Sequence, residues 1–171
     1  PEAAVQGRLA LPEEALVMMG DYLHYALTAT ARQGFRRIHL AGMWAKLVKA
    51  ALAVPQTHVR NGALETRQAA DLLVDLGLDG PAAAALARAN TAREIYERLR
   101  AADRDDLVTA VCDRARVQAE AWSGLPVTVY LVTAEEGVVW RVADCTDRCE
   151  RAGSQPRTAA AEQGPRGRGC E

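Results

Sequence analysis

The fold is decided by residues 20–65, which read GDYLHYALTATARQGFRRIHLAGMWAKLVKAALAVPQTHVRNGALE. Short apolar runs typical of strands alternate here with segments in which apolar residues recur at helical spacing. Gly20-Asp21 and Gly42 stand where such strands should end. In an open α/β sheet, ligands bind beyond the carboxyl ends of the strands. We therefore expect a ligand site near these residues, the alternative being that the glycines only permit tight turns.

Two strand–helix units are predicted in series. The apolar run at 15–19 predicts a strand, and the helical pattern after it ends at Gly34. Residues 37–41 predict a second strand, followed by a helix over 44–54 that Pro55 stops. Two such units in series predict parallel strands joined by right-handed crossovers.

The rest of the chain predicts a helical region and then a hairpin. Helical patterns occupy residues 65–76, 81–89, 91–99 and 105–123, and β-branched runs occupy 127–132 and 138–142. The predicted fold class is therefore α/β, with a small parallel sheet, flanking helices, a helical middle and a C-terminal β-hairpin. We expect one domain over residues 1–144. Residues 145–171 are poor in large apolar side chains and predict a disordered tail.

Composition excludes several classes of protein. The 171 residues are 49% hydrophobic and 25% charged, which is typical of a globular domain. With 21 basic and 22 acidic residues, the chain has no bulk charge that favours nucleic acid or an anionic membrane. Neither a membrane-spanning run nor a signal peptide is visible. We expect a cytoplasmic protein.

Catalytic and metal-binding motifs of several common classes are missing from the sequence. It has no phosphate-binding loop of the Walker type, no dinucleotide fingerprint and no nucleophile elbow. His24, His39 and His58 are not at metal-ligand spacing, and Cys145 and Cys149 lack the further ligands that structural zinc requires. We expect no metal site in the protein and assign no catalytic residue. The remaining candidates are groups that bind anions.

Basic residues gather around the predicted second strand and helix. Lys46 and Lys49 lie on the first turns of that helix, and His58 and Arg60 follow in a loop. The helix N-terminus adds unpaired N–H groups and a partial positive charge, an arrangement that suits carboxylates or phosphates. The pair Arg36-Arg37 precedes the strand. The alternative is that these arginines and Lys49 form a solvated basic surface.

Four motifs in order give the chain a resemblance to a known family. They are Gly20-Asp21, Gly34-Phe35, Gly42-Met43-Trp44-Ala45-Lys46-Leu47-Val48-Lys49 and Gln56-Thr57-His58. The chain resembles the cobalt-precorrin-5B (C(1))-methyltransferases of cobalamin biosynthesis. That family carries a Gly-Asp or similar turn, Gly-Phe, Gly-His-Ile-Gly-Lys-Leu-Val-Lys and Asn-Thr-His in the same order. The resemblance covers roughly residues 14–65 and continues more weakly to about residue 125.

The resemblance implies a function and a set of ligands. It implies methyl transfer from S-adenosylmethionine to C-1 of cobalt-precorrin-5B, giving cobalt-precorrin-6A. The substrate is a polycarboxylate tetrapyrrole that brings its own cobalt. By this resemblance the cofactor site includes Gly20, Asp21 and Gly42. The implied substrate-binding residues are Lys46, Lys49, Thr57, His58 and Arg60.

The sequence also departs from the family pattern. Met43 replaces a histidine, Ala45 a glycine and Gln56 an asparagine. Members of the family are longer than this chain, so the resemblance also implies that an N-terminal half is missing. These departures keep open a non-catalytic tetrapyrrole-binding or interaction domain, either a truncated paralogue or half of a split enzyme. A third alternative is a phosphate- or sugar-binding α/β module, because this fold class serves many functions.

Overall fold

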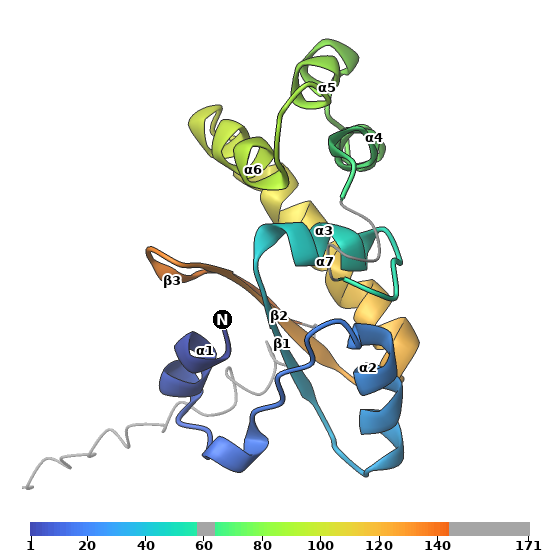
Figure 1. Ribbon diagram of the computed structural model, residues 1–171, viewed down its shortest axis with the longest axis vertical. Helices are drawn as coiled ribbons and strands as arrows, with labels where there is room; N and C mark the ends of the chain where they lie inside the picture. The colour runs from blue at the N-terminus through green and yellow to red at the C-terminus, as the bar shows by residue number, and fades with distance from the viewer. Residues whose placement is uncertain (58–63, 144–171) are drawn as a thin grey trace, which may run out of the picture.

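The computed structural model describes residues 1–57 and 64–143 (Figure 1). Among these residues are the helices α1 (Glu2–Leu9), α2 (Leu23–Arg32), α3 (Trp44–Ala51), α4 (Thr66–Asp75), α5 (Gly80–Leu86), α6 (Ala92–Ala101) and α7 (Asp105–Ser123). A 3-10 helix, η1, covers Glu13–Ala15, and the strands are β1 (Ile38–Gly42), β2 (Val127–Thr133) and β3 (Gly137–Val142). The predicted tail at 145–171 lies outside the described residues.

The strands form one sheet in the order β1-β2-β3. β1 pairs in parallel with β2, with Ile38 opposite Val127, whereas β2 and β3 are an antiparallel hairpin. The α/β class, the helical middle and the C-terminal hairpin are confirmed. The sheet is mixed, because the hairpin adds β3 to its one parallel pair.

Helices cover both faces of the sheet (Figure 1). On one face, Leu40, Val129 and Leu131 join the main core, which α7 and α3 complete. On the other face, Val5 of α1 packs against Tyr130 and Val132 in a smaller cluster. Side chains alternate between faces along a strand, so β2 buries both sets at once.

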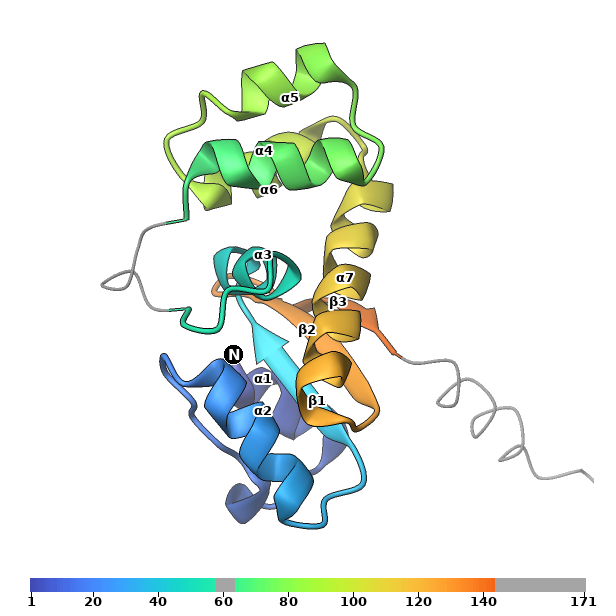
Figure 2. The ribbon, with the colours of Figure 1, turned by 90° about the vertical axis from the view of Figure 1, so that its right-hand side faces the viewer.

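The helices α4, α5 and α6 form a group beyond the sheet, connected to it by α3 and the long α7 (Figure 2). Local signals place them well. The hydroxyl of Thr91 accepts a hydrogen bond of 3.1 Å from the Glu94 N–H and so caps α6. Ile95 and Leu99 on the inner face of α6 are buried.

The predicted first strand at 15–19 is wrong. The chain forms η1 up to Ala15 and then no regular element before α2. Val17 and Met18 are 69% and 82% exposed. The second predicted strand, at 37–41, is β1, but its parallel neighbour is β2, which comes much later in the chain, so the predicted pairing of two strands in series is wrong. A strand is stable only when a neighbour satisfies its backbone groups, and apolar composition alone does not supply one.

Two other boundaries differ from expectation. The helix α1 was not predicted, because its pattern offers only Val5 as a buried residue. The helix α3 ends at Ala51 and not at residue 54, since Ala53 takes a left-handed φ of 57° that breaks the helical path before Pro55. No helix of the described residues is long and apolar enough to cross a membrane.

Candidate functional site

The candidate site lies where β1 ends and α3 begins, as the sequence predicts. Gly42 is the last residue of β1, and Met43 caps α3 with extended backbone. A Cβ added to Gly42 would stand 3.0 Å from Cδ2 of Leu47. Glycine therefore lets the strand turn directly into the helix while Leu47 stays 1% exposed in the core.

A second segment reaches this place through the turn before α2. Gly20 has a left-handed φ of 55°, which favours glycine, and the Tyr22 N–H closes the turn on the Met19 carbonyl at 3.0 Å. The Gly20 carbonyl oxygen accepts hydrogen bonds from Lys46 Nζ at 3.3 Å and from Thr57 Oγ1 at 3.4 Å. One carbonyl thus joins the turn before α2, the first turn of α3 and the loop after α3.

Lys49 completes this arrangement from inside the protein. Its Nζ donates to the Thr57 carbonyl at 3.2 Å, and the residue is only 6% exposed. The alternative that Lys49 belongs to a solvated basic surface is therefore wrong. Lys46, in contrast, is exposed. We call Gly20, Lys46, Lys49 and Thr57 the Gly20 cluster.

Asp21 brings a carboxylate to the edge of the Gly20 cluster. It is 5% exposed and has interaction partners in its surroundings. Buried carboxylates are rarely tolerated without hydrogen-bond donors or cations, so the interactions of Asp21 help to hold this turn in place. Met43 is 46% exposed at the start of α3 and offers an apolar surface beside these polar groups.

Of the other predicted basic residues, the two that the structure describes, Arg36 and Arg37, do not join the cluster. His58 and Arg60 lie outside the described residues. Arg36 and Arg37 precede β1, whereas the Gly20 cluster lies beyond its end at Gly42. A strand rises about 3.3 Å per residue, so the length of β1 separates the two groups by roughly 15 Å.

Two histidines have the packing roles that their positions predict. His24 meets Trp122 of α7 edge to face, with ring centroids 5.3 Å apart. His39 Nδ1 lies 3.0 Å from the hydroxyl of the buried Tyr130. Burial, followed by the charges of Arg37 and Arg141, lowers the pKa of His39 below its usual 6.5. No local pattern predicts this histidine–tyrosine pair, because its members are 91 residues apart in the chain.

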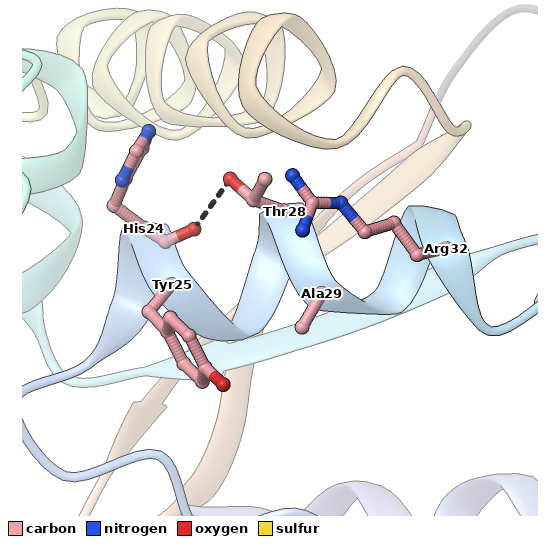
Figure 3. Close-up of a pocket in the computed structure, with 5 residues that line it drawn as sticks. All are labelled: His24, Tyr25, Thr28, Ala29 and Arg32. Carbon is pink, nitrogen blue, oxygen red and sulfur yellow. Dashed lines mark hydrogen bonds between the residues drawn. The ribbon is translucent and has the colours of Figure 1, made fainter.

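A shallow pocket of about 200 Å³ lies on α2 (Figure 3). Its lining residues are His24, Tyr25, Thr28, Ala29 and Arg32, none of which was predicted as a site residue. His24, Thr28 and Arg32 repeat every four residues and point to the same side of α2, while Tyr25 points to the opposite side. The Thr28 hydroxyl donates to the His24 carbonyl at 2.9 Å, so it is occupied within the helix.

Nothing in the described part of the chain is arranged to hold a metal ion. No group of three or more histidine, cysteine, aspartate or glutamate side chains comes together there. The site chemistry of the described residues therefore rests on the donors and the carboxylate at the end of β1.

Comparisons with known proteins point to one family. Residues 56–143 match the family model described as CbiD, C-terminal domain. A relative from Desulfotalea psychrophila, named cobalt-precorrin-5B C(1)-methyltransferase, is 53% identical over 138 residues, which are 81% of this chain and 38% of the relative. Relatives of the same name from Geobacter metallireducens and Geobacter sulfurreducens are 45% and 43% identical over 62% and 69% of this chain.

The chain matches only part of these relatives. The matched regions cover 38%, 28% and 33% of the three proteins. No solved structure matches the chain. The activity of the complete relatives therefore applies to this chain only through an argument about its own residues.

Proposed function

The chain belongs to the family of the CbiD C-terminal domain, and from this premise we propose that it serves as the C-terminal part of a cobalt-precorrin-5B C(1)-methyltransferase. The proposed reaction transfers a methyl group from S-adenosylmethionine to C-1 of cobalt-precorrin-5B and yields cobalt-precorrin-6A in cobalamin biosynthesis. The observation that carries this proposal is the Gly20 cluster, in which three separate segments meet at one carbonyl oxygen beyond β1.

The residues at this end of β1 fit the polar groups of S-adenosylmethionine. A carboxylate such as that of Asp21 accepts hydrogen bonds from ribose hydroxyls or from an amino group, and because Asp21 is 5% exposed, the cofactor would have to reach it below the surface of the turn. A Cβ at Gly20 would meet nothing within 4 Å, so the backbone of this turn has open space beside it for the close approach of a ligand. When bound, the cofactor supplies an electrophilic methyl group on a sulfonium sulfur.

The substrate is a macrocycle with several carboxylate arms, and Lys46 is the side chain best placed to bind one of them. Its ammonium is exposed and is held over the turn by the Gly20 carbonyl. Lys49 is buried, so we assign it to the positioning of Thr57. The contribution of this chain to the rate is then to orient the two reactants, which can supply a large part of an enzymatic acceleration.

The second candidate function is a tetrapyrrole-binding or interaction domain without catalytic residues of its own. The observation in its favour is the share of the relatives that this chain matches, 38% or less in the three compared. In that case the methyl donor binds to the part of the enzyme that this chain does not include.

Calorimetric titration with S-adenosylhomocysteine, the demethylated product of the cofactor, tests the proposal. We expect binding in the micromolar range that Asp21→Ala weakens at least about tenfold, a loss of about 1.4 kcal/mol. Lys46→Ala should weaken this binding less than Asp21→Ala does, because Lys46 is assigned to the substrate. Asp71→Ala and Arg67→Ala are matched controls, because both residues are exposed on α4, away from the cluster.

The result distinguishes the two candidates. If a chain that circular dichroism shows to be folded does not bind S-adenosylhomocysteine, the cofactor site is not in this domain and the interaction function is preferred. Equal losses of binding in Asp21→Ala and in the α4 controls would show that Asp21 is not part of the cofactor site.

A further inference from the structure

The large apolar side chains that reach solvent are concentrated in one short segment. Among the large apolar side chains of the described residues, the four with the highest exposed fractions are Met18 at 82%, Tyr25 at 72%, Val17 at 69% and Tyr22 at 61%. We call these four the 17–25 patch. Single exposed apolar residues are ordinary, but a concentration of this kind is typical of an interaction surface.

The four side chains belong to one outer surface. Tyr22 and Tyr25 are three residues apart at the start of α2 and therefore lie on the same side of that helix. Leu23 and Leu27 bury the other side of α2 in the main core. Figure 3 shows Tyr25 pointing away from α7, opposite to His24. Val17 and Met18 belong to the segment that leads into α2 and runs beside it (Figure 2).

The strand β1 forms an edge of the sheet. β1 has one strand neighbour among residues 1–57 and 64–143, namely β2. The unpaired backbone groups of an edge strand can pair with another polypeptide, and native proteins usually cover or protect such edges. The side of the molecule formed by α6, α7 and the hairpin is different, since it carries exposed ion pairs such as Arg93–Glu97, Arg98–Glu94 and Arg104–Asp106. Charged groups on that side are well solvated, whereas the 17–25 patch exposes apolar side chains to water.

The sequence excludes one occupant and the relatives supply another. Residues 144–171 contain no Val, Leu, Ile, Met, Phe, Tyr or Trp, so this segment has no large apolar side chains to cover the patch. The match to the Desulfotalea psychrophila relative covers 38% of that protein, which leaves most of its length outside the comparison. In a complete enzyme that length is a polypeptide covalently joined to this domain.

We propose that the 17–25 patch is the surface on which the remaining part of the family's chain docks, through apolar side chains of its own. The inference rests on the proposal that this chain is the C-terminal part of a longer methyltransferase. Gly20 and Asp21 lie within the same segment, between Met18 and Tyr22. The docked polypeptide therefore borders the Gly20 cluster and completes the wall of the site.

A fusion tests the docking surface without any ligand. The part of the Desulfotalea psychrophila relative outside the match is joined ahead of Pro1, and the thermal stability of the fused chain is compared with that of the chain alone. The variant Tyr22→Ser/Tyr25→Ser should lower the melting temperature of the fused chain by about 5 °C or more. It should change that of the chain alone by about 1 °C or less, because both side chains are exposed there.

The variant Val74→Ser/Val117→Ser is the matched control, since these valines are 44% and 47% exposed and lie on α4 and α7. It should have the same small effect in both chains. Amide hydrogens of residues 16–25 should also exchange at least about tenfold more slowly in the fused chain. Equal melting shifts and equal exchange in the two chains would overturn the proposal.

Sedimentation of the chain alone separates the docking proposal from self-association. If the chain forms a dimer that Tyr22→Ser/Tyr25→Ser dissociates, the occupant is a second copy and the proposal is wrong. None of these measurements uses S-adenosylhomocysteine or a tetrapyrrole. The docking surface can therefore fail while the proposed activity holds, and the reverse is also possible.

Discussion

Lys46 and Lys49 are three residues apart on α3, yet their surroundings give them different tasks. Lys49→Ala should lower the free energy of unfolding by about 1–3 kcal/mol, because it leaves the buried Thr57 carbonyl without its donor. Lys46→Ala should cost about 0.5 kcal/mol or less, because Lys46 is exposed. Urea unfolding measures both values.

The difference in burial between Lys46 and Lys49 decides which of the two can be substituted to test ligand binding. A loss of binding in Lys49→Ala is confounded by a loss of structure, whereas Lys46→Ala reports on the ligand directly. Lys49→Met keeps the length and the apolar stem of the side chain and separates packing from hydrogen bonding. Equal costs for Lys46→Ala and Lys49→Ala would contradict the burial that distinguishes them.

His39 should titrate below pH 6.5, because burial, and then the charges of Arg37 and Arg141, lower its pKa. The neutral ring is thus favoured in the folded state. As the pH falls below 6.5, the unfolded chain binds the proton first, and the stability that His39 contributes is lost until the folded state is protonated too. NMR titration of the imidazole measures the folded pKa.

Arg37→Gln should raise this pKa towards 6.5, because it removes one of the two positive charges that disfavour protonation. Arg36→Gln is a matched control, since Arg36 is exposed and is not among the groups that shift His39. A folded-state value at or above 6.5 in the unmodified chain would contradict the arrangement on this face of the sheet.

The residues of the candidate site could be predicted from sequence only in part. Gly20, Lys46 and Thr57 were singled out by strand ends and motifs, and the structure brings them together. The burial of Lys49 could not be predicted, because it depends on how the loop after α3 folds back over the helix. Arg37 was grouped with the lysines because it is near them in sequence. The structure separates them, because β1 lies between Arg37 and the lysines of α3.

At the scale of elements, the cap of α6 offers a direct test. Thr91→Ala removes the hydroxyl that accepts from the Glu94 N–H at 3.1 Å and should lower the free energy of unfolding by about 1 kcal/mol. Thr91→Ser keeps the hydroxyl and should leave the free energy of unfolding about unchanged, because serine is at least as good an N-cap residue as threonine. Chemical denaturation of the two variants checks the difference, and equal losses would show that the methyl group matters and the cap does not.

Elements whose signals are local were predicted well, and elements whose partners are distant were not. The helical spacing of α2 and α3, the capping signal of α6 and the turn of the β2–β3 hairpin lie within a few residues of the elements that they specify. The run at 15–19 has the composition of a strand but no neighbour to pair with. The pairing of β1 with β2 depends on the packing of α3 and α7, which lie between the two strands in the sequence. No short window of sequence contains all of these elements.

At the scale of the whole molecule, Cys112 reports on the integrity of the core. Its side chain is fully buried, and burial raises the pKa of its thiol from 9.0 to about 12. The folded state thus keeps the proton that the unfolded chain loses above pH 9. Stability should fall between pH 9 and 12 by about 1.4 kcal/mol per pH unit from this residue.

Urea unfolding of the chain and of Cys112→Ala from pH 8 to 10.5 checks this slope. Other groups that titrate in this range cancel in the difference between the two proteins. The difference should be constant up to about pH 9 and should narrow above it. A constant difference over the whole range would contradict a protonated, buried thiol.

The parallel pairing of β1 with β2 also has a consequence for synthesis on the ribosome. Ile38 faces Val127, so β1 is translated 89 residues before its neighbour. At about 5–20 residues per second, the nascent β1 and the apolar faces of α2 and α3 wait roughly 4–18 s for the strand that completes their core. During that interval the chain is exposed to aggregation and is a natural client for a chaperone that acts near the exit tunnel.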